Sequence, residues 1–448
     1  INGMIFAFMK NLAFNLTDER IDEIMKRILR KRLTVLILII PVLFVFHGCE
    51  KDEIIPEDIE ARDELHDIMN EWYYWYDQMP QVDKTQYSNP YELLEAMRYL
   101  PDDHYSFVAP REYIENSIQG KYIGYGFAHR KDTEGQHRIL FVYKDSPLFS
   151  EGIERGYIIT RINGTILDEN SDLRNLLGPN EVGVTNTIEF RTPADSVILV
   201  TVSKKEIQKN SVLHYDTLHI SGKIVGHMVF EEFIEPSYVE FDETFEFFNT
   251  TGTEELIIDL RYNPGGLTNV LARLANLITG PATDGKIMIQ YEHNDKKTDY
   301  NSEILFEQQD NSLNVERVVF ITSEGTASSS EALINCLKPY ISITLVGEST
   351  YGKPVGMYVF KYADWAFLPI VFKITNADGE GDYFNGIPVD YVCADDITRR
   401  FDDRQEACLK EVLYYIENGS FSGTKYEKIV APKTRLSYKE LIRKSYLK

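Results

Sequence analysis

The chain has 448 residues, of which 43% are hydrophobic and 12% aromatic, so it can bury several cores and does not have the composition of a disordered protein. Its formal net charge is −23. Because binding to a phosphate backbone requires a basic face, this charge argues against nucleic acid as a partner, and we interpret the acidity as a contribution to solubility.

The first segment has the pattern of an export signal. A basic stretch after Met25 precedes an apolar run of 14 residues, 33–46. This run is too short to span a bilayer comfortably and is typical of a signal-peptide core, with a buried N-terminal helix as the alternative. A small residue then precedes Cys49 in a pattern that resembles a bacterial lipoprotein box. The resemblance implies a lipid anchor at Cys49 and a location at the outer membrane, on its periplasmic or cell-surface face. The acidic run 50–53 either resembles the surface-export signal of Bacteroidetes lipoproteins or is a solvated tether.

We expect a multidomain α/β protein with the following consecutive segments: an upstream segment with a lipoprotein signal peptide (1–48), a tether (49–54), a small helical N-terminal domain (55–115), a β-rich domain (116–205), and an α/β core with a C-terminal helix and tail (206–448). The helical domain is predicted from apolar and aromatic residues at helical spacing between 65 and 76 and again at 91–97. Such an aromatic stripe is more typical of a core than of a ligand site.

The β-rich domain alternates short strands with turns, and Gly124-Tyr125-Gly126-Phe127 opens one of its strands. The domain resembles a PDZ domain. In such a domain, successive backbone N–H groups capture a C-terminal carboxylate, and the bound peptide adds a strand to the sheet. The resemblance implies that these four residues bind the C-terminus of a polypeptide. A degenerate domain that only packs or gates is the alternative.

Strands and helices alternate along the last segment, which predicts an α/β core. Ser328 lies where an apolar strand, 318–321, gives way to a helix, and the N–H groups at a helix start can stabilise an oxyanion. Lys353 follows a second strand, 341–346, and a strand–helix–strand unit brings the ends of its parallel strands together. A lysine can serve as base for a serine only when it is neutral, a state that burial favours.

Two other interpretations of these residues need no serine chemistry. Ser328 and Glu331 have the spacing of a capping box, and the motif alone does not separate a cap from a nucleophile. The stretch from Gly347 to Lys353 imitates a P-loop. However, Pro354 stands where a Ser or Thr would bind Mg²⁺, so we do not expect a nucleotide site.

A third motif adds weight to the nucleophile. Residues 259–266 read DLRYNPGG, a strand followed by a tight turn. In this order, the motifs at 259–266, 326–331 and 347–353 resemble the C-terminal processing peptidases, also called tail-specific proteases. The resemblance implies a ClpP/crotonase-like catalytic core that needs no cofactor.

The same resemblance implies roles for individual residues. Ser328 would attack the substrate, and Lys353 would be its base. The oxyanion donors would be the backbone N–H groups of Ser329 and of Gly265 or Gly266. We therefore expect a serine endopeptidase that recognises polypeptides through their C-termini and hydrolyses them through an acyl-enzyme.

One departure from the family keeps a second function open. The family often has a glutamine four residues after the lysine, which orients the amine, and this chain has Met357 there. The alternative is therefore a catalytically weak or inactive peptide-binding lipoprotein. The sequence leaves the oligomeric state open.

We expect no metal site. His214, His219 and His227 lie on or near predicted strands without a nucleophile motif beside them, and we interpret them as structural. The spacing H-E-x-x-H does not occur. Cys393 and Cys408, 15 residues apart in a chain that we expect to be exported, are candidates for a disulfide.

Overall fold

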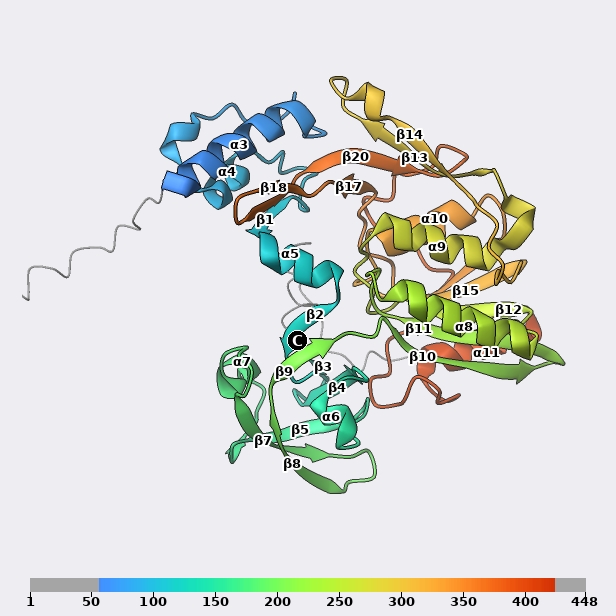
Figure 1. The fold of residues 1–448 in the computed structure, drawn as a ribbon. Coiled ribbons are helices and arrows are strands. Elements are labelled where there is room, and N and C mark those ends of the chain that lie inside the picture. Colours follow the sequence, from blue (N-terminus) through green and yellow to red (C-terminus); the bar gives the residue numbers. More distant parts are fainter. Residues whose placement is uncertain (1–55, 424–448) are drawn as a thin grey trace, which may run out of the picture. The chain divides into compact units, whose positions relative to one another are not determined.

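The computed structural model describes residues 56–423 (Figure 1). The predicted signal peptide, the tether, the lipid anchor at Cys49 and the end of the C-terminal tail lie outside the described residues. Among residues 56–423, no helix is both long enough and apolar enough to cross a bilayer.

The first described elements are two helices, α3 (Pro56–Trp72) and α4 (Pro90–Met97). The side chain of Asn89 caps α4 by accepting from a backbone N–H, and a proline at the first helical position suits a helix start. Buried side chains of both helices, among them Leu65 and Leu93, belong to one core cluster. The chain then enters β1 (Phe107–Pro110), which pairs antiparallel with β19 (Trp365–Leu368). The N-terminal segment is therefore joined to the C-terminal part of the chain through a sheet.

A β-rich module follows the helix α5 (Arg111–Ile118). The strands β2 (Lys121–Gly124) and β9 (Lys205–Gln208) pair antiparallel where the chain enters and leaves the module. The module's sheet has the order β3-β4-β5-β7-β8, and β6 pairs with β5. The bounds of its elements are Phe127–Lys131 for β3, His137–Val142 for β4, Pro147–Ser150 for α6, Ile158–Ile162 for β5, Thr165–Ile166 for β6, Leu173–Leu177 for α7, Thr185–Arg191 for β7 and Val197–Ser203 for β8. In this order β3 lies at one end of the sheet.

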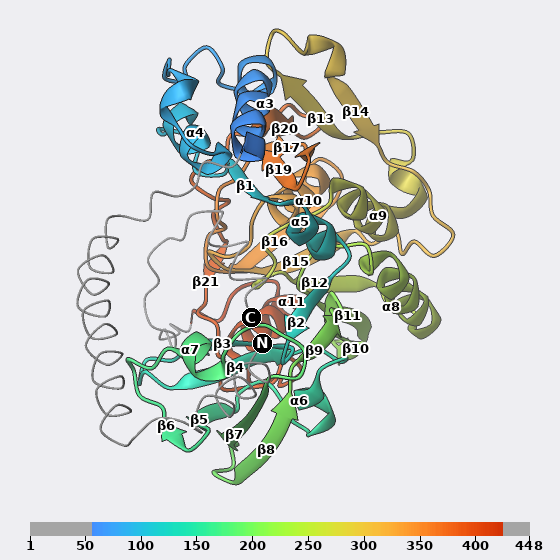
Figure 2. The same cartoon turned by 60° about the vertical axis from the view of Figure 1, so that its left-hand side comes forward.

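The largest core surrounds a six-stranded sheet of order β10-β11-β12-β15-β16-β21 (Figure 2). Its first pair is an antiparallel hairpin, and the other pairs are parallel. The strands are Val212–Ile220 (β10), Lys223–Phe230 (β11), Glu255–Asp259 (β12), Arg317–Thr322 (β15), Ser342–Gly347 (β16) and Tyr391–Val392 (β21). Alternate side chains of a strand point to opposite faces. Accordingly, Ile258 packs with the helices α8 (Ser237–Thr251), α9 (Thr268–Thr279) and α10 (Ser329–Leu337), whereas Ile257 packs with α11 (Ala407–Asn418).

Two smaller sheets complete the described chain. One has the order β14-β13-β20-β17, and the other joins β1, β19 and β18. The remaining strands are Ile287–His293 (β13), Ser302–Leu305 (β14), Val355–Met357 (β17), Phe360–Tyr362 (β18) and Ile370–Thr375 (β20). The short helices are Lys84–Gln86 (η1), Gly280–Thr283 (η2) and Thr298–Tyr300 (η3).

Candidate active site

Ser328 lies between the end of β15 and the first residue of α10, as the strand-to-helix pattern predicts. Its backbone has φ 55° and ψ −116°, a conformation that costs a residue with a side chain about 1–3 kcal/mol. The neighbouring turn makes room for it. A Cβ atom on Gly265 would lie 2.7 Å from the Cβ of Ser328, and Gly265 itself has φ 104°. Residues in such sparsely populated conformations cluster at active sites.

Lys353 lies in the loop between β16 and β17 and is 2% exposed. Its Nζ is 3.5 Å from the Oγ of Ser328, at the outer limit of a hydrogen bond. Burial lowers the pKa of Lys353 to about 7, although the charges of Glu331 and Asp103 act in the opposite direction. The structure thus brings a neutral amine within reach of the serine hydroxyl near neutral pH.

The buried Glu331 carboxylate connects the serine segment to the lysine segment. It accepts hydrogen bonds from the backbone N–H groups of Ser328 (2.9 Å), Gly352 (2.6 Å) and Lys353 (2.8 Å), and from the hydroxyl of Thr350 (2.6 Å). Burial raises the pKa of Glu331 to about 7, against the effect of these hydrogen bonds. The capping-box pattern therefore marks a residue that also positions the lysine loop, a role that the spacing alone did not reveal.

The DLRYNPGG turn lies against the start of α10. The N–H of Gly265 donates to the side-chain oxygen of Asn263 (2.9 Å), whereas the carbonyl of Gly266 accepts from the hydroxyl of Ser329 (2.7 Å). A Cβ atom on Gly265 would lie 3.0 Å from the backbone nitrogen of Ser329. Of the two glycines that the sequence offered, Gly265 has its N–H engaged, which leaves Gly266 and Ser329 as the candidate oxyanion donors.

The N-terminal segment also supports the lysine loop. The hydroxyl of Tyr105 donates to the carbonyl of Gly352 (2.6 Å), a contact between residues 247 positions apart. The backbone near Tyr105 is held in turn by the buried Asp103 carboxylate, which accepts from the N–H groups of Tyr105 (3.0 Å) and Ser106 (2.8 Å). Met357, which stands at the position of the family glutamine, lies on β17 and pairs with Ile370. The backbone of the lysine segment is thus fixed by Glu331 and Tyr105.

The turn is tied to the β-rich module through a buried ionic network. Arg155, from that module, and Arg261, from the turn motif, both pair with Asp395, at 2.8 and 2.9 Å. The hydroxyl of Tyr262 donates to the same carboxylate (2.6 Å), and Arg261 also pairs with Glu406 (2.7 Å). Although burial acts the other way, the arginines hold the pKa of the Asp395 carboxyl well below its usual range.

The four residues predicted to bind a peptide C-terminus run from the last residue of β2 to the first residue of β3, and all four are buried. Gly126 has φ 74°, and a Cβ atom on it would lie 2.6 Å from the Cβ of Ser146. The hydroxyl of Ser146 donates to the carbonyl of Tyr125 (2.7 Å), and the N–H of Tyr143 donates to the carbonyl of Gly126 (2.8 Å). These bonds fix the loop at the start of β3. Since β3 ends the sheet order, its outer edge pairs with no strand among the described residues.

The proposed disulfide is absent, because Cys393 and Cys408 are free buried thiols in the structure. The thiol of Cys408 lies 3.6 Å from the carbonyl oxygen of Cys393 and 3.5 Å from that of Ala394. The prediction from their spacing in the sequence was therefore wrong.

Two family profiles match the chain: "Peptidase family S41" over residues 224–393 and "Peptidase S41 N-terminal domain" over residues 60–107. The chain is 24% identical over 299 residues to the carboxy-terminal processing protease CtpA of Bacillus subtilis, covering 66% of this chain and 61% of the relative. It is 22% identical over 297 residues to a protein named "Probable CtpA-like serine protease" of Staphylococcus epidermidis, covering 65% of this chain and 57% of the relative. The chain thus spans less than two thirds of the length of these relatives.

Among solved structures, the fold is similar to that of a candidate S41 protease from Bacteroides fragilis NCTC 9343. The TM-score is 0.68 with 21% sequence identity, and the match covers 80% of this chain and 97% of the other. At this identity, the likeness shows the multidomain α/β fold alone. The two profile matches, over residues 60–107 and 224–393, and the distant CtpA relatives show that the chain is similar to the S41 family of serine peptidases and to the C-terminal processing proteases.

Proposed function

We propose that this chain hydrolyses peptide bonds through an acyl-enzyme at Ser328, with Lys353 as the general base. The observation that carries the proposal is the 3.5 Å approach of a buried lysine Nζ to the serine Oγ, with the pKa of that lysine lowered to about 7. At pH 7 about half of such lysines are neutral, against roughly one in 3,000 for a lysine at its ordinary pKa. The base therefore needs no histidine.

The reaction follows from this geometry. The Oγ of Ser328 bonds to the carbonyl carbon of the substrate while its proton passes to the Nζ of Lys353. The negative oxygen that forms is stabilised by the N–H groups of Ser329 and Gly266. When the C–N bond breaks, Lys353 returns its proton to the leaving amine. Water then attacks the acyl-enzyme, again with Lys353 as base, and releases Ser328.

We further propose that polypeptides are recognised through their C-termini at the β-rich module. The outer edge of β3 supports this proposal, because this edge pairs with no strand of residues 56–423 and a peptide strand can add to such an edge; β3 begins at Phe127, the last of the four predicted residues. The similarity to a relative named as a carboxy-terminal processing protease also supports it. A peptide that carries a C-terminal amide in place of the carboxylate should bind more weakly. Equal binding of both peptides would argue against this mode of recognition.

The catalytic proposal is tested by cleavage of an unfolded, tagged model protein by purified residues 54–448 between pH 6 and 10. We expect cleavage to disappear in Ser328→Ala and in Lys353→Ala. The matched controls are Ser150→Ala and Lys338→Ala, which change exposed residues and should cleave normally. Cleavage that survives in either dyad variant would reject the mechanism. Absence of cleavage by the parent chain, with C-terminal peptides still bound, would favour the peptide-binding lipoprotein instead, the function that Met357 keeps open.

The membrane location is a separate proposal that rests on the sequence pattern around Cys49. We propose that the chain is exported and anchored to the outer membrane through lipid on this cysteine. In cells given a labelled fatty acid, the full-length chain should incorporate the label and fractionate with the outer membrane, and Cys49→Ser should do neither. An unlabelled wild-type chain would refute the anchor.

A further inference from the structure

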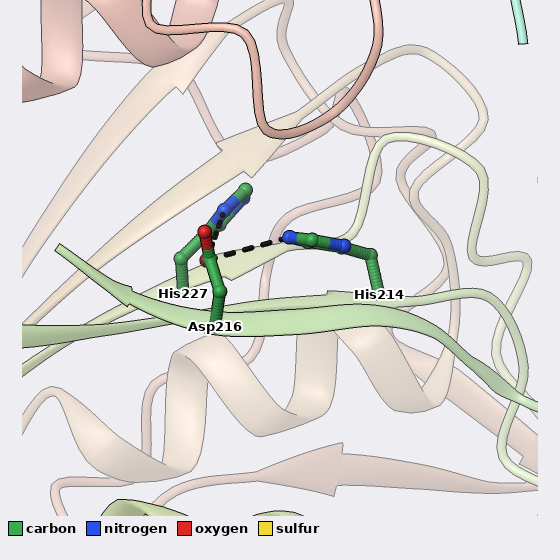
Figure 3. Close-up of side chains that lie close together, drawn as sticks. All are labelled: His214, Asp216 and His227. Atoms are coloured by element: carbon green, nitrogen blue, oxygen red, sulfur yellow. Dashed lines mark ion pairs between the residues drawn. The ribbon is translucent and has the colours of Figure 1, made fainter. Parts of the chain in front are cut away.

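Two histidines and an aspartate lie together on the hairpin β10–β11, as Figure 3 shows. His214 and Asp216 are two residues apart on β10, so their side chains point to the same face of the sheet. The register of the hairpin places His227 of β11 opposite Asp216. Each residue offers one ligand atom, and these three atoms all lie within 4.8 Å of one another. Among residues 56–423, no other group of three His, Cys, Asp or Glu side chains brings its ligand atoms this close together.

The distances suit a metal ion better than a hydrogen-bonded triad. The Oδ1 of Asp216 is 3.4 Å from the Nε2 of His214 and 3.3 Å from the Nδ1 of His227. Both distances exceed the usual hydrogen-bond range of about 2.7–3.2 Å. Two ligand atoms held about 2.0–2.1 Å from a tetrahedral ion are separated by about 3.3 Å, because they subtend an angle of about 109°. The distance from the carboxylate oxygen to each ring nitrogen thus matches the distance between two ligand atoms of one tetrahedral zinc ion.

The most buried of the three side chains, His227, lacks hydrogen-bond partners. His227 is 1% exposed, and neither of its ring nitrogens makes a hydrogen bond in the structure. A buried polar atom without a partner costs about 1–3 kcal/mol, so native structures rarely retain one. An ion bound at Nδ1 would satisfy one of the two nitrogens. The side chains of His214 and Asp216 are 25% and 32% exposed, which gives an ion access from solvent.

We propose that His214, Asp216 and His227 bind a divalent transition-metal ion, and that Zn²⁺ fits the site best. Two imidazoles and one carboxylate form a donor set that Zn²⁺ accepts, whereas Mg²⁺ and Ca²⁺ prefer oxygen alone. Water completes the coordination. The ion links β10, the first strand in the order of the large sheet, to β11. The site is separate from the serine–lysine dyad and stands whether or not the dyad cleaves peptides.

The test is calorimetric titration of Zn²⁺ into the purified, chelator-treated chain, together with thermal melts. We expect one ion per chain and a higher melting temperature with Zn²⁺. We also expect at least tenfold weaker binding in both His214→Gln and His227→Gln. His214 is partly exposed, so its variant should fold even if the variant of the buried His227 does not. The matched control is His219→Gln, which changes an exposed histidine on the other face of the same strand and should bind normally.

A second pair of histidines in the β-rich module offers an alternative zinc site that the same titration can distinguish. The Nδ1 atoms of His129 and His137 lie 3.5 Å apart in the β-rich module. Zn²⁺ binding that is lost in His129→Gln but retained in His214→Gln would overturn the proposal. Absence of binding to the wild-type chain would also overturn it, as would an X-ray absorption spectrum with sulfur among the zinc ligands.

Discussion

The Glu331 carboxylate allows a prediction whose magnitude follows from its contacts. In Glu331→Gln, an amide NH₂ replaces one carboxylate oxygen, so two of the four donors around it lose their acceptor. A hydrogen bond to a charged group contributes about 1.5–3 kcal/mol, so the two lost bonds should lower the free energy of unfolding by about 3–6 kcal/mol, an upper value above pH 7 because the neutral amide also relieves the burial cost that raises the pKa of Glu331. That is a large part of the roughly 5–15 kcal/mol by which a domain is stable. Urea denaturation at pH 8 measures it, with Glu324→Gln, at an exposed position before α10, as control.

Glu331→Gln also shows whether Glu331 positions Ser328 and Lys353 or only stabilises the fold. In molecules that stay folded, Ser328 and Lys353 lose their common anchor, and a shift of about 1 Å can lower the rate about 100-fold. The loss of the negative charge also removes an interaction that raises the pKa of Lys353. The acid limb of the kcat/KM profile should therefore move to lower pH. A purely structural effect would scale activity equally at every pH. An unchanged urea midpoint with an unmoved acid limb would refute this account of Glu331.

Three further predictions concern the turn, the module and the base. Gly265→Ala should abolish activity, because its Cβ would lie 2.7 Å from the Cβ of the serine, whereas Gly152→Ala, also at positive φ but with nothing within 4 Å, should keep activity; equal activity of the two would contradict the close approach. Arg155→Met should lower the free energy of unfolding by about 3–5 kcal/mol, because it breaks a buried ion pair, whereas Arg161→Met, at an exposed pair, should change it by less than about 1 kcal/mol. Because folding lowers the pKa of Lys353 from 10.5 to about 7, the unfolded chain binds more protons between these values, and stability should rise with pH there. Lys353→Met should flatten that rise in urea titrations at several pH values, and a slope equal to that of the parent would show that the lysine is not buried as described.

Part of the site could be placed from the sequence because its geometry is local. Ser328 and Lys353 flank one strand–helix–strand unit, and the parallel pairing of β15 with β16 brings the ends of those strands together. The DLRYNPGG turn follows the same pattern, because β12, the strand that precedes it, pairs in parallel with β15. What the sequence could not decide was which glycine N–H is engaged, since that depends on the rotamer of the Asn263 side chain.

Other features depend on contacts between distant parts of the chain. Nothing in a single sequence links Tyr105 to Gly352. The two residues are 247 positions apart, and their hydrogen bond depends on the pairing of β1 with β19. The cluster of His214, Asp216 and His227, in contrast, could have been predicted from the sequence through the register of its hairpin, which an analysis of hydrophobic periodicity does not consider. A Ser-Gly turn at 221–222 fixes the hairpin register, and that register places His227 opposite Asp216.

The shared carboxylate of Asp395 has a mechanical consequence. Arg155 and Arg261 come from different parts of the fold and cannot separate from each other without one of them leaving the same buried anion. Removing one partner of a buried ion pair costs about 3–5 kcal/mol, so at 25 °C such a separation would occur in fewer than about 1 in 100 molecules. The β-rich module, which contains Arg155 and β3, and the turn that carries Gly265 therefore move together rather than independently.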